Sequence, residues 1–129
     1  MKNIIDVLRS MPDFIGSNGR SKEEIELAET MLEVAFARDY RDYLEEIGLA
    51  CFDGHELTGL TKTDRLNVVT VTMEQRERFG KIASTWYVIE EANIYGIVIW
   101  QDTEGFVYEA ASNAKVKKVA DSLSEYFTR

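Results

Sequence analysis

Residues 86–108 read WYVIEEANIYGIVIWQDTEGFVY, and this stretch decides the fold class. Trp86–Glu91 is rich in aromatic and β-branched residues, so it predicts a strand, and Asn93–Gly96 predicts the turn that follows. Ile97–Trp100 carries apolar side chains on both faces, as a central strand of a sheet does. A second turn leads into a third strand at Phe106–Tyr108. Sequential strands joined by short turns predict an antiparallel meander.

Two apolar stripes at helical spacing precede this block. Ser21–Glu24 has the S-x-x-E pattern of a capping box, so it predicts the start of a helix. The stripe behind this start comprises Ile25, Ala28, Met31 and Leu32, with Leu27 at its edge. A second helix is predicted to end at Gly48, where a left-handed residue terminates many helices. Its stripe comprises Tyr40, Tyr43, Leu44 and Ile47.

Both ends of the chain also predict helices. Residues 2–10 have the spacing of a short amphipathic helix, and the polar segment Gly16–Arg20 predicts a mobile loop. The last segment predicts a closing helix, because its apolar residues recur at helical spacing. Those residues are Val116, Val119, Leu123 and Phe127.

The middle of the chain predicts short strands. Ala50–Phe52 and Glu56–Leu60 are weak strand candidates, and Leu66–Thr72 is a firmer one. Met73–Phe79 predicts a helical turn or a short helix. Helices, then antiparallel strands, then a final helix is an order typical of the α+β class. We therefore expect N-terminal helices, a mostly antiparallel β-sheet meander and a C-terminal helix packed on the sheet.

The length fits one domain, which we expect to span residues 1–129, with residues 1–20 as an N-terminal helix and mobile loop. The single cysteine, Cys51, allows no internal disulfide bond and suits a reducing compartment. Asp6 falls where the apolar run of a secretory signal would begin, and the apolar runs are far shorter than the ~20 residues of a membrane span. We expect a cytoplasmic protein that does not bind membranes.

The net charge is −8, from 23 acidic against 15 basic residues. This balance repels phosphate backbones, which argues against nucleic acid as a ligand and suits a basic protein partner. Much of the charge lies in residues 21–47, where nine acids and three bases give −6. The helical wheel places on the outer face the acids that we expect to bind a protein, namely Glu26, Glu29, Glu33, Asp42, Glu45 and Glu46. The alternative is a solvated helix face that binds no partner.

No residue pattern predicts catalysis or a bound cofactor. His55 and Cys51 are four residues apart, but Asp53–Gly54 predicts a turn between them, and a nucleophile needs its base within hydrogen-bond reach. One histidine and one cysteine do not make a zinc site, and the sequence has no phosphate-binding loop motif. Asp102–Gly105 holds two acids and a glycine, but it is more simply a hairpin turn. We expect no catalytic residue, no metal and no cofactor.

Two other chemistries stay open as alternatives. An acid–base enzyme needs a pair of carboxylates, and 23 acids offer many pairings, although Glu90 and Glu91 point to opposite faces of their strand. The aromatic residues of the strand block could stack on bases or sugars. Proteins that bind single strands combine such residues with a basic groove, whereas the neighbours here are acidic. Packing in the core is the better explanation for these aromatic residues.

Several ordered motifs span residues 21–128. The first helix contains Ser21-x-x-x-Ile25-x-x-Ala28-Glu29-x-x-Leu32, and the second follows from Phe36-Ala37-Arg38-Asp39-Tyr40-x-x-Tyr43-Leu44. Later motifs are Gly59-Leu60 at a strand end, Asp102-x-x-Gly105-x-Val107 at a turn, and Ser122-x-x-Glu125-Tyr126-Phe127 in the closing helix. As a set, they resemble the SUKH superfamily, which groups bacterial immunity proteins with the fungal Smi/Knr cell-wall regulators.

Two positions depart from the pattern of that superfamily. Phe36-Ala37 stands where the family usually has Leu-Pro, so the proline before the second helix is missing. Gly48-Leu49 replaces a common Asn-Gly turn. Neither departure touches a catalytic residue, because the family has no catalytic signature.

The resemblance implies a binding protein. Bacterial members are typically encoded beside polymorphic toxins, many of them nucleases, and neutralise the cognate toxin domain. We therefore expect a non-catalytic immunity protein, or antitoxin, that acts as a monomer or weak dimer on a basic toxin domain. The alternative is a regulatory scaffold of the cell-wall and stress-signalling type that binds several endogenous partners.

Overall fold

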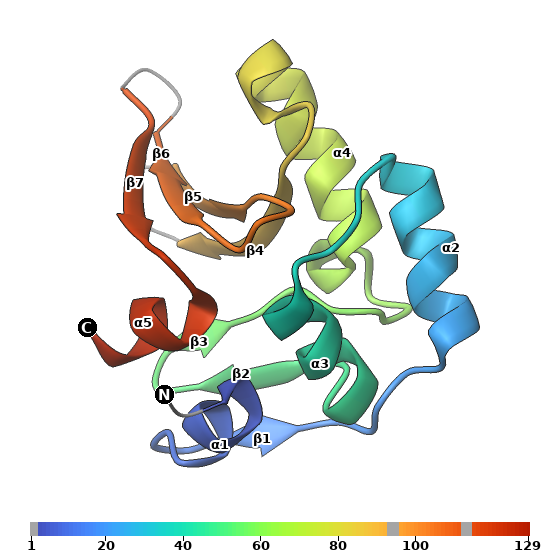
Figure 1. The fold of residues 1–129 in the computed structure, drawn as a ribbon, viewed down its shortest axis with the longest axis vertical. Coiled ribbons are helices and arrows are strands. Elements are labelled where there is room, and N and C mark those ends of the chain that lie inside the picture. Colours follow the sequence, from blue (N-terminus) through green and yellow to red (C-terminus); the bar gives the residue numbers. More distant parts are fainter. Residues whose placement is uncertain (1–2, 93–95, 112–114) are drawn as a thin grey trace.

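The computed structural model describes residues 3–92, 96–111 and 115–129, and Figure 1 shows the fold. The helices are α1 (Ile4–Arg9), α2 (Lys22–Leu32), α3 (Arg38–Glu46), α4 (Val68–Phe79) and α5 (Leu123–Thr128), with 3₁₀ turns η1 (Asp64–Leu66) and η2 (Gly80–Ala83). The strands are β1 (Ile15–Gly16), β2 (Ala50–Phe52), β3 (His55–Glu56), β4 (Tyr87–Ala92), β5 (Ile97–Gln101), β6 (Val107–Ala110) and β7 (Lys117–Ala120).

The strands form two antiparallel sheets, of order β1-β2-β3 and β4-β5-β6-β7. Strands β4, β5 and β6 of the larger sheet are the predicted meander, in which Trp100 of β5 pairs with Val88 on one side and Tyr108 on the other, and β7 is a fourth strand that was not predicted. Helix α5 follows β7 and packs against it. The α+β class is therefore confirmed. Of the predicted turn at Asn93–Gly96, residues 93–95 lie outside the described residues.

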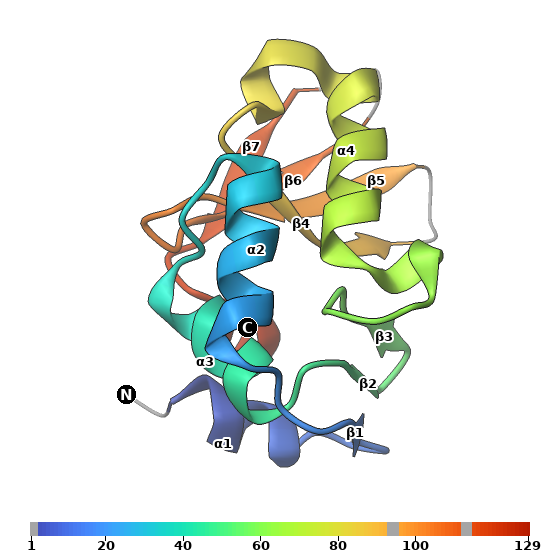
Figure 2. The same cartoon turned by 90° about the vertical axis from the view of Figure 1, so that its right-hand side faces the viewer.

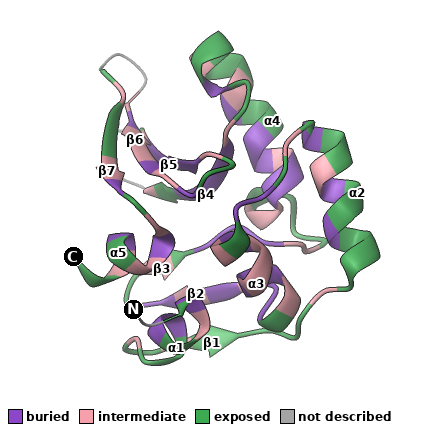
Figure 3. Ribbon diagram, in the orientation of Figure 1, coloured by how far each residue is buried: buried purple, intermediate pink, exposed green. Residues whose placement is uncertain are grey.

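Both faces of the larger sheet are buried. Val98 and Trp100 belong to a cluster with Val71 of α4 and Ala83 of η2, so these two elements cover one face. Alternate residues of the same strands, such as Ile99, join a larger cluster with residues of α1, α3 and α5. Figure 3 shows the buried positions concentrated where these elements meet. The sheet therefore lies between two groups of helices, which explains why β5 is apolar on both faces.

The strand predicted at Leu66–Thr72 is wrong, because α4 begins there. Asn67 caps this helix, and its side-chain oxygen accepts hydrogen bonds from Val69 N at 2.9 Å and Thr70 N at 3.2 Å. Most of the β-branched residues that suggested a strand are buried in the helix instead, where Val71 packs in the cluster of the larger sheet and Thr72 Oγ1 accepts a hydrogen bond from Val88 N at 3.0 Å. Tertiary packing thus overrides a weak local preference. Met73–Phe79 continues the same helix rather than forming a separate one.

The closing helix is shorter than predicted. Val119 lies in β7, which pairs with β6, and Val116 precedes that strand, so neither belongs to a helix. Pairing with β6 is supported by an ion pair of 3.6 Å between Lys117 Nζ and Glu109 Oε2. Helix α5 begins after Ser122, whose hydroxyl accepts a hydrogen bond from Glu125 N at 3.1 Å. The strand predicted at Glu56–Leu60 is also shorter, because β3 ends at Glu56.

The N-terminal segment is part of the folded unit. Ile4 and Leu8 of α1 are buried in the main cluster, beside α3 and α5. The polar loop at Gly16–Arg20 is tied to the body by its backbone, since Ser17 N donates to Leu49 O at 2.9 Å and Arg20 N to Leu44 O at 2.8 Å. The loop that the sequence predicted to be mobile is therefore held to the rest of the protein by two tertiary hydrogen bonds.

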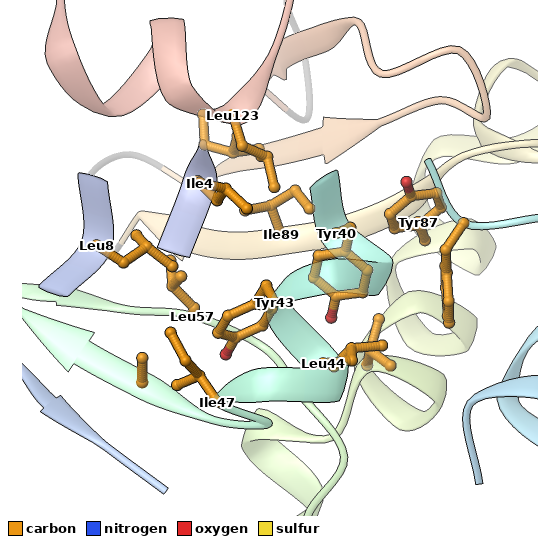
Figure 4. Packing of buried hydrophobic residues seen from close by; sticks show 14 of the residues in the cluster. Ile4, Leu8, Tyr40, Tyr43, Leu44, Ile47, Leu57, Tyr87, Ile89 and Leu123 are labelled. Atoms are coloured by element: carbon orange, nitrogen blue, oxygen red, sulfur yellow. The ribbon is translucent and has the colours of Figure 1, made fainter. Parts of the chain in front are cut away.

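Helices α2 and α3 form as the sequence predicts. Ser21 and Glu24 make a reciprocal capping box, in which each side chain accepts a hydrogen bond from the other residue's backbone N–H. The backbone after α3 turns at Gly48, whose φ of 76° lies in the left-handed region. The predicted stripe of α3 is almost completely buried, and it consists of Tyr40, Tyr43, Leu44 and Ile47. Figure 4 shows these residues packed together with Ile4 and Leu8 of α1, Ile89 of β4 and Leu123 of α5.

The start of α4 gives a direct test of the corrected assignment. We expect Asn67→Ala to lower the free energy of unfolding by about 1–2 kcal/mol, because the first turn loses its side-chain acceptor. Asn67→Asp keeps that acceptor, and both variants lose the hydrogen bond of 2.8 Å from Asn67 Nδ2 to Thr61 O, so the difference between the two variants reports on the cap. Urea denaturation of both variants measures the difference, and an unchanged midpoint for Asn67→Ala would argue against a helix capped at this residue.

Candidate protein-binding surface

The predicted acids lie along two neighbouring helices, α2 and α3. Glu26, Asp42 and Glu45 line one hollow of about 420 Å³ between them. Glu26 also lines a neighbouring hollow together with Glu29 and Glu33. The structure therefore brings five of the six predicted residues to one continuous region, and Glu46 is the one outside both hollows.

Basic residues are interleaved with these acids. Lys22, Arg38 and Arg41 line the same hollow as Glu26, Asp42 and Glu45, so positive and negative groups alternate there. Arg38 Nε lies 3.3 Å from Asp42 Oδ1, in an i,i+4 pair on the surface of α3. An exposed pair of this kind contributes at most about 1 kcal/mol, so a partner can exchange it for a contact of its own.

Glu29 differs from the other acids because its carboxylate serves the fold. Its Oε2 accepts a hydrogen bond of 2.7 Å from Phe36 N and also pairs with Arg41. These contacts fix the connection between α2 and α3, and the Glu29 side chain is only 12% exposed. The contacts of Glu29 are therefore explained by its role in stabilising the fold. Glu26, Glu33 and Glu46 are exposed and make no ion pair with a described residue, although the charge of Glu33 acts on Arg76.

Two apolar residues that the sequence placed in or beside the buried stripe of α2 are exposed in the structure. Met31 was predicted in the buried stripe of α2, but it is 50% exposed, and Leu27 is 61% exposed. The core uses only Ile25, Ala28 and Leu32. The sequence did contain a sign of this exposure, because the apolar residues of α2 cover a wider arc of the helix than a single buried stripe occupies. Both residues line a groove between α2 and α4.

The one histidine is partly exposed, with 38% of its side chain accessible, and it contacts a buried carboxyl group. His55 Nδ1 lies 2.8 Å from Glu90 Oε1, and Tyr126 OH donates to Glu90 Oε2 at 2.9 Å. Burial and the adjacent Glu90 raise the pKa of Tyr126 above its ordinary value, so the phenol stays neutral and can donate. Glu90 is itself buried, so its hydrogen bonds with His55 and Tyr126 satisfy a carboxyl group that would otherwise be costly to bury. The cluster of His55, Glu90 and Tyr126 joins β3, β4 and α5.

Cys51 does not complete this cluster as a nucleophile. In the hairpin of β2 and β3, His55 pairs with Phe52, and their rings lie 5.4 Å apart on one face. Cys51 is next to Phe52 in the strand, so its side chain points to the opposite face.

Among the described residues, no three His, Cys, Asp or Glu side chains are grouped as a metal site would require. Nor is any helix in the described ranges both long and apolar enough to span a membrane.

Comparison with known proteins identifies the family. The family model SUKH_5, described as SMI1-KNR4 cell-wall, matches residues 1–129. This chain belongs to the SMI1-KNR4 family. The resemblance to the SUKH superfamily is thereby confirmed, and members of this family are generally non-catalytic immunity proteins. A search of the curated proteins found no match.

The structure explains two features of the family pattern. A Cβ atom at Gly59 would lie 2.0 Å from the carbonyl oxygen of Gly48, so only glycine permits this approach between the two loops. At the second feature, Ala37 replaces the usual proline, and its N–H donates a hydrogen bond of 2.8 Å to Tyr87 OH. Proline has no N–H, so this SMI1-KNR4 protein gains a bond between the start of α3 and β4 that the usual residue cannot make.

The distinction between structural and surface acids is measurable. We expect Glu29→Ala to lower the free energy of unfolding by about 1–3 kcal/mol, because Phe36 N and Arg41 lose a partly buried partner. Glu26→Ala, on the same helix but exposed, should change it by less than about 0.5 kcal/mol. Urea denaturation of the two variants compares them, and equal losses would show that Glu29 has no special structural role.

Proposed function

We propose that this chain is a non-catalytic immunity protein that binds a cognate toxin domain, such as a nuclease, and neutralises it. The observation that carries the proposal is membership of the SMI1-KNR4 family together with the charge of −6 concentrated in residues 21–47. The binding surface is the outer side of α2 and α3, and the protein acts as a monomer or weak dimer. No cofactor takes part.

Electrostatics supports a basic partner. A nuclease holds phosphate groups and therefore presents positive potential around its substrate site. An acidic inhibitor is steered towards that site, which raises the association rate more than the intrinsic affinity. Glu26, Glu33 and Glu46 supply negative charge that the described residues do not neutralise by ion pairs.

A regulatory scaffold is the second candidate, because the matching family model carries the description cell-wall. Such a scaffold would bind several endogenous partners rather than one toxin. The two candidates predict different neighbouring genes and different proteins that co-purify with this chain. A toxin gene beside this one, with a single tight partner, favours immunity.

Co-expression tests the proposal. We expect a host that expresses the toxin encoded beside this gene to survive only when this chain is also present, and the two proteins to co-purify as one complex. Survival without a stable complex would contradict direct binding. Death of the host despite soluble chain would contradict neutralisation itself.

Charge reversal tests the surface. We expect Glu26→Lys to slow association with the toxin several-fold at low salt, and the difference to shrink as salt screens the charges. Glu104→Lys is the control, since Glu104 is an exposed acid in the turn between β5 and β6. Stopped-flow association rates over a range of salt concentrations give the comparison. Equal slowing by the control would mean that only net charge matters, and that α2 is not the binding surface.

A further inference from the structure

Three large apolar side chains are exposed on two neighbouring helices. Leu27 and Met31 lie on α2, and Met73, which is 45% exposed, lies on α4. The two helices run side by side at the surface that faces the viewer in Figure 2. Among the described residues, the other exposed large apolar side chains are Ile15 and Ile82, each on a different element. The exposed apolar surface is therefore concentrated at α2 and α4.

A groove of about 750 Å³ separates these helices. Leu27 and Met31 line it from α2, Val69 from α4, and Leu60 from the loop that precedes η1. Met73 follows Val69 by one turn on the same side of α4, so it extends the apolar wall. The size suits several side chains of a ligand. Polar and charged residues share the lining with these apolar side chains, and they are Arg20, Glu24, Thr61, Lys62, Asn67 and Thr70. A groove that combines apolar surface with polar groups that fix orientation is typical of binding sites.

The walls of the groove are held in place by tertiary contacts. Arg76 of α4 donates hydrogen bonds of 2.9 Å to Leu32 O, at the end of α2, and to Trp86 O, before β4. At the other end, Arg20 Nε donates to Leu60 O at 2.7 Å. Because both ends are fixed, the groove exists before a partner arrives, and binding requires little reordering.

Negative charge borders the apolar wall on the α2 side. Glu24 lines the groove itself, and Glu23 lies one turn before Leu27 on the same side of the helix. Glu26 is adjacent to Leu27, about 100° around the helix, towards α3. The outer surface of α2 thus carries an apolar side next to α4 and an acidic side next to α3. Lys62, across the groove, has no ion-pair partner among the described residues.

We infer that the α2–α4 groove is the apolar centre of the interface with the toxin, and that the acids of α2 form its charged rim. The occupant is a segment of a basic protein that inserts large apolar side chains between Leu27, Met31 and Val69. Lysine or arginine residues beside those side chains meet Glu23, Glu24 and Glu26. This inference rests on the proposed function and names the part of the partner that the surface recognises.

Charge complementarity decides between this occupant and a second copy of the chain. Each copy carries −8, so two copies repel each other through their net charge, and the acids Glu23, Glu24 and Glu26 beside the groove outnumber its basic residues Arg20 and Lys62. Like charges that face each other across an interface oppose association. A basic segment gains from the same acids that would repel a second copy.

The size of a stable interface also links the groove to the acidic side of α2. A standard interface buries about 800 Å² on each partner, which is roughly a tenth of the 7299 Å² surface of this chain. The mouth of one groove is smaller than that, so the partner must extend over α2. Fully buried apolar residues at the centre carry most of the affinity, while charged residues at the rim set the association rate.

Dissociation kinetics with the toxin encoded beside this gene test the inference. We expect Leu27→Ala together with Met31→Ala to raise the dissociation rate at least about tenfold, with little change in the association rate or its dependence on salt. Ile82→Ala is the control, because Ile82 is exposed to a similar degree but lies on η2. Both variants should keep the urea midpoint of the unsubstituted chain, which separates lost binding from lost folding.

The outcomes separate the two proposals. If the unsubstituted chain does not bind the toxin, the proposed function fails. If it binds, and the Leu27 and Met31 variant dissociates no faster than the Ile82 variant, the groove is not the centre of the interface, although the function stands. If the chain forms dimers in sedimentation experiments and the Leu27 and Met31 variant does not, the occupant is a second copy and the inference is overturned.

Discussion

Three buried tyrosines can keep their hydroxyl groups in the core only because each finds a fixed hydrogen-bond partner. Tyr40 OH lies 2.9 Å from Thr58 Oγ1, and Tyr43 OH donates to Thr58 O at 2.9 Å. Tyr87 OH donates to Gln101 Oε1 at 2.7 Å. Burial raises the pKa of all three phenols above the ordinary value, so they remain neutral donors. An unpaired hydroxyl at these positions would cost about 1–3 kcal/mol, which makes this geometry specific.

Thr58 connects these tyrosines to the sheet. Its hydroxyl donates to Val88 O at 2.7 Å, and its backbone N donates to Ile89 O at 2.8 Å. Helix α3 is thereby fixed to β4, and Asp39 adds a second attachment by accepting hydrogen bonds from Gln101 Nε2 and Leu123 N, both at 2.9 Å. With α3 fixed on the sheet and Arg76 tying α4 to α2, the outer surface of α2 has a set position. A rigid surface of this kind suits a protein that works by binding alone.

Local patterns in the sequence predicted the elements whose cause is local. The capping box at Ser21, the stripe of α3 and the strands of the meander depend on residues close together in the chain, and all are confirmed. The β-branched run at Leu66–Thr72 wrongly predicted a strand, because tertiary packing of this segment favours the helix α4. Glu26 and Glu33 of α2 are exposed as predicted, but Glu29 is largely buried, because it pairs with Arg41 in a tertiary contact that no helical wheel contains. The groove could not be predicted from the sequence either, because it depends on the tertiary packing of α2 beside a helix about 40 residues later in the chain.

Titration of the purified toxin with this chain tests most directly whether the protein acts by binding alone. If neutralisation is stoichiometric, toxin activity falls in a straight line and reaches zero at one chain per toxin molecule, and the toxin keeps its mass. Loss of all activity at a small fraction of an equivalent, with a covalent change in the toxin, would show that the chain is an enzyme and contradict a function based on its surface.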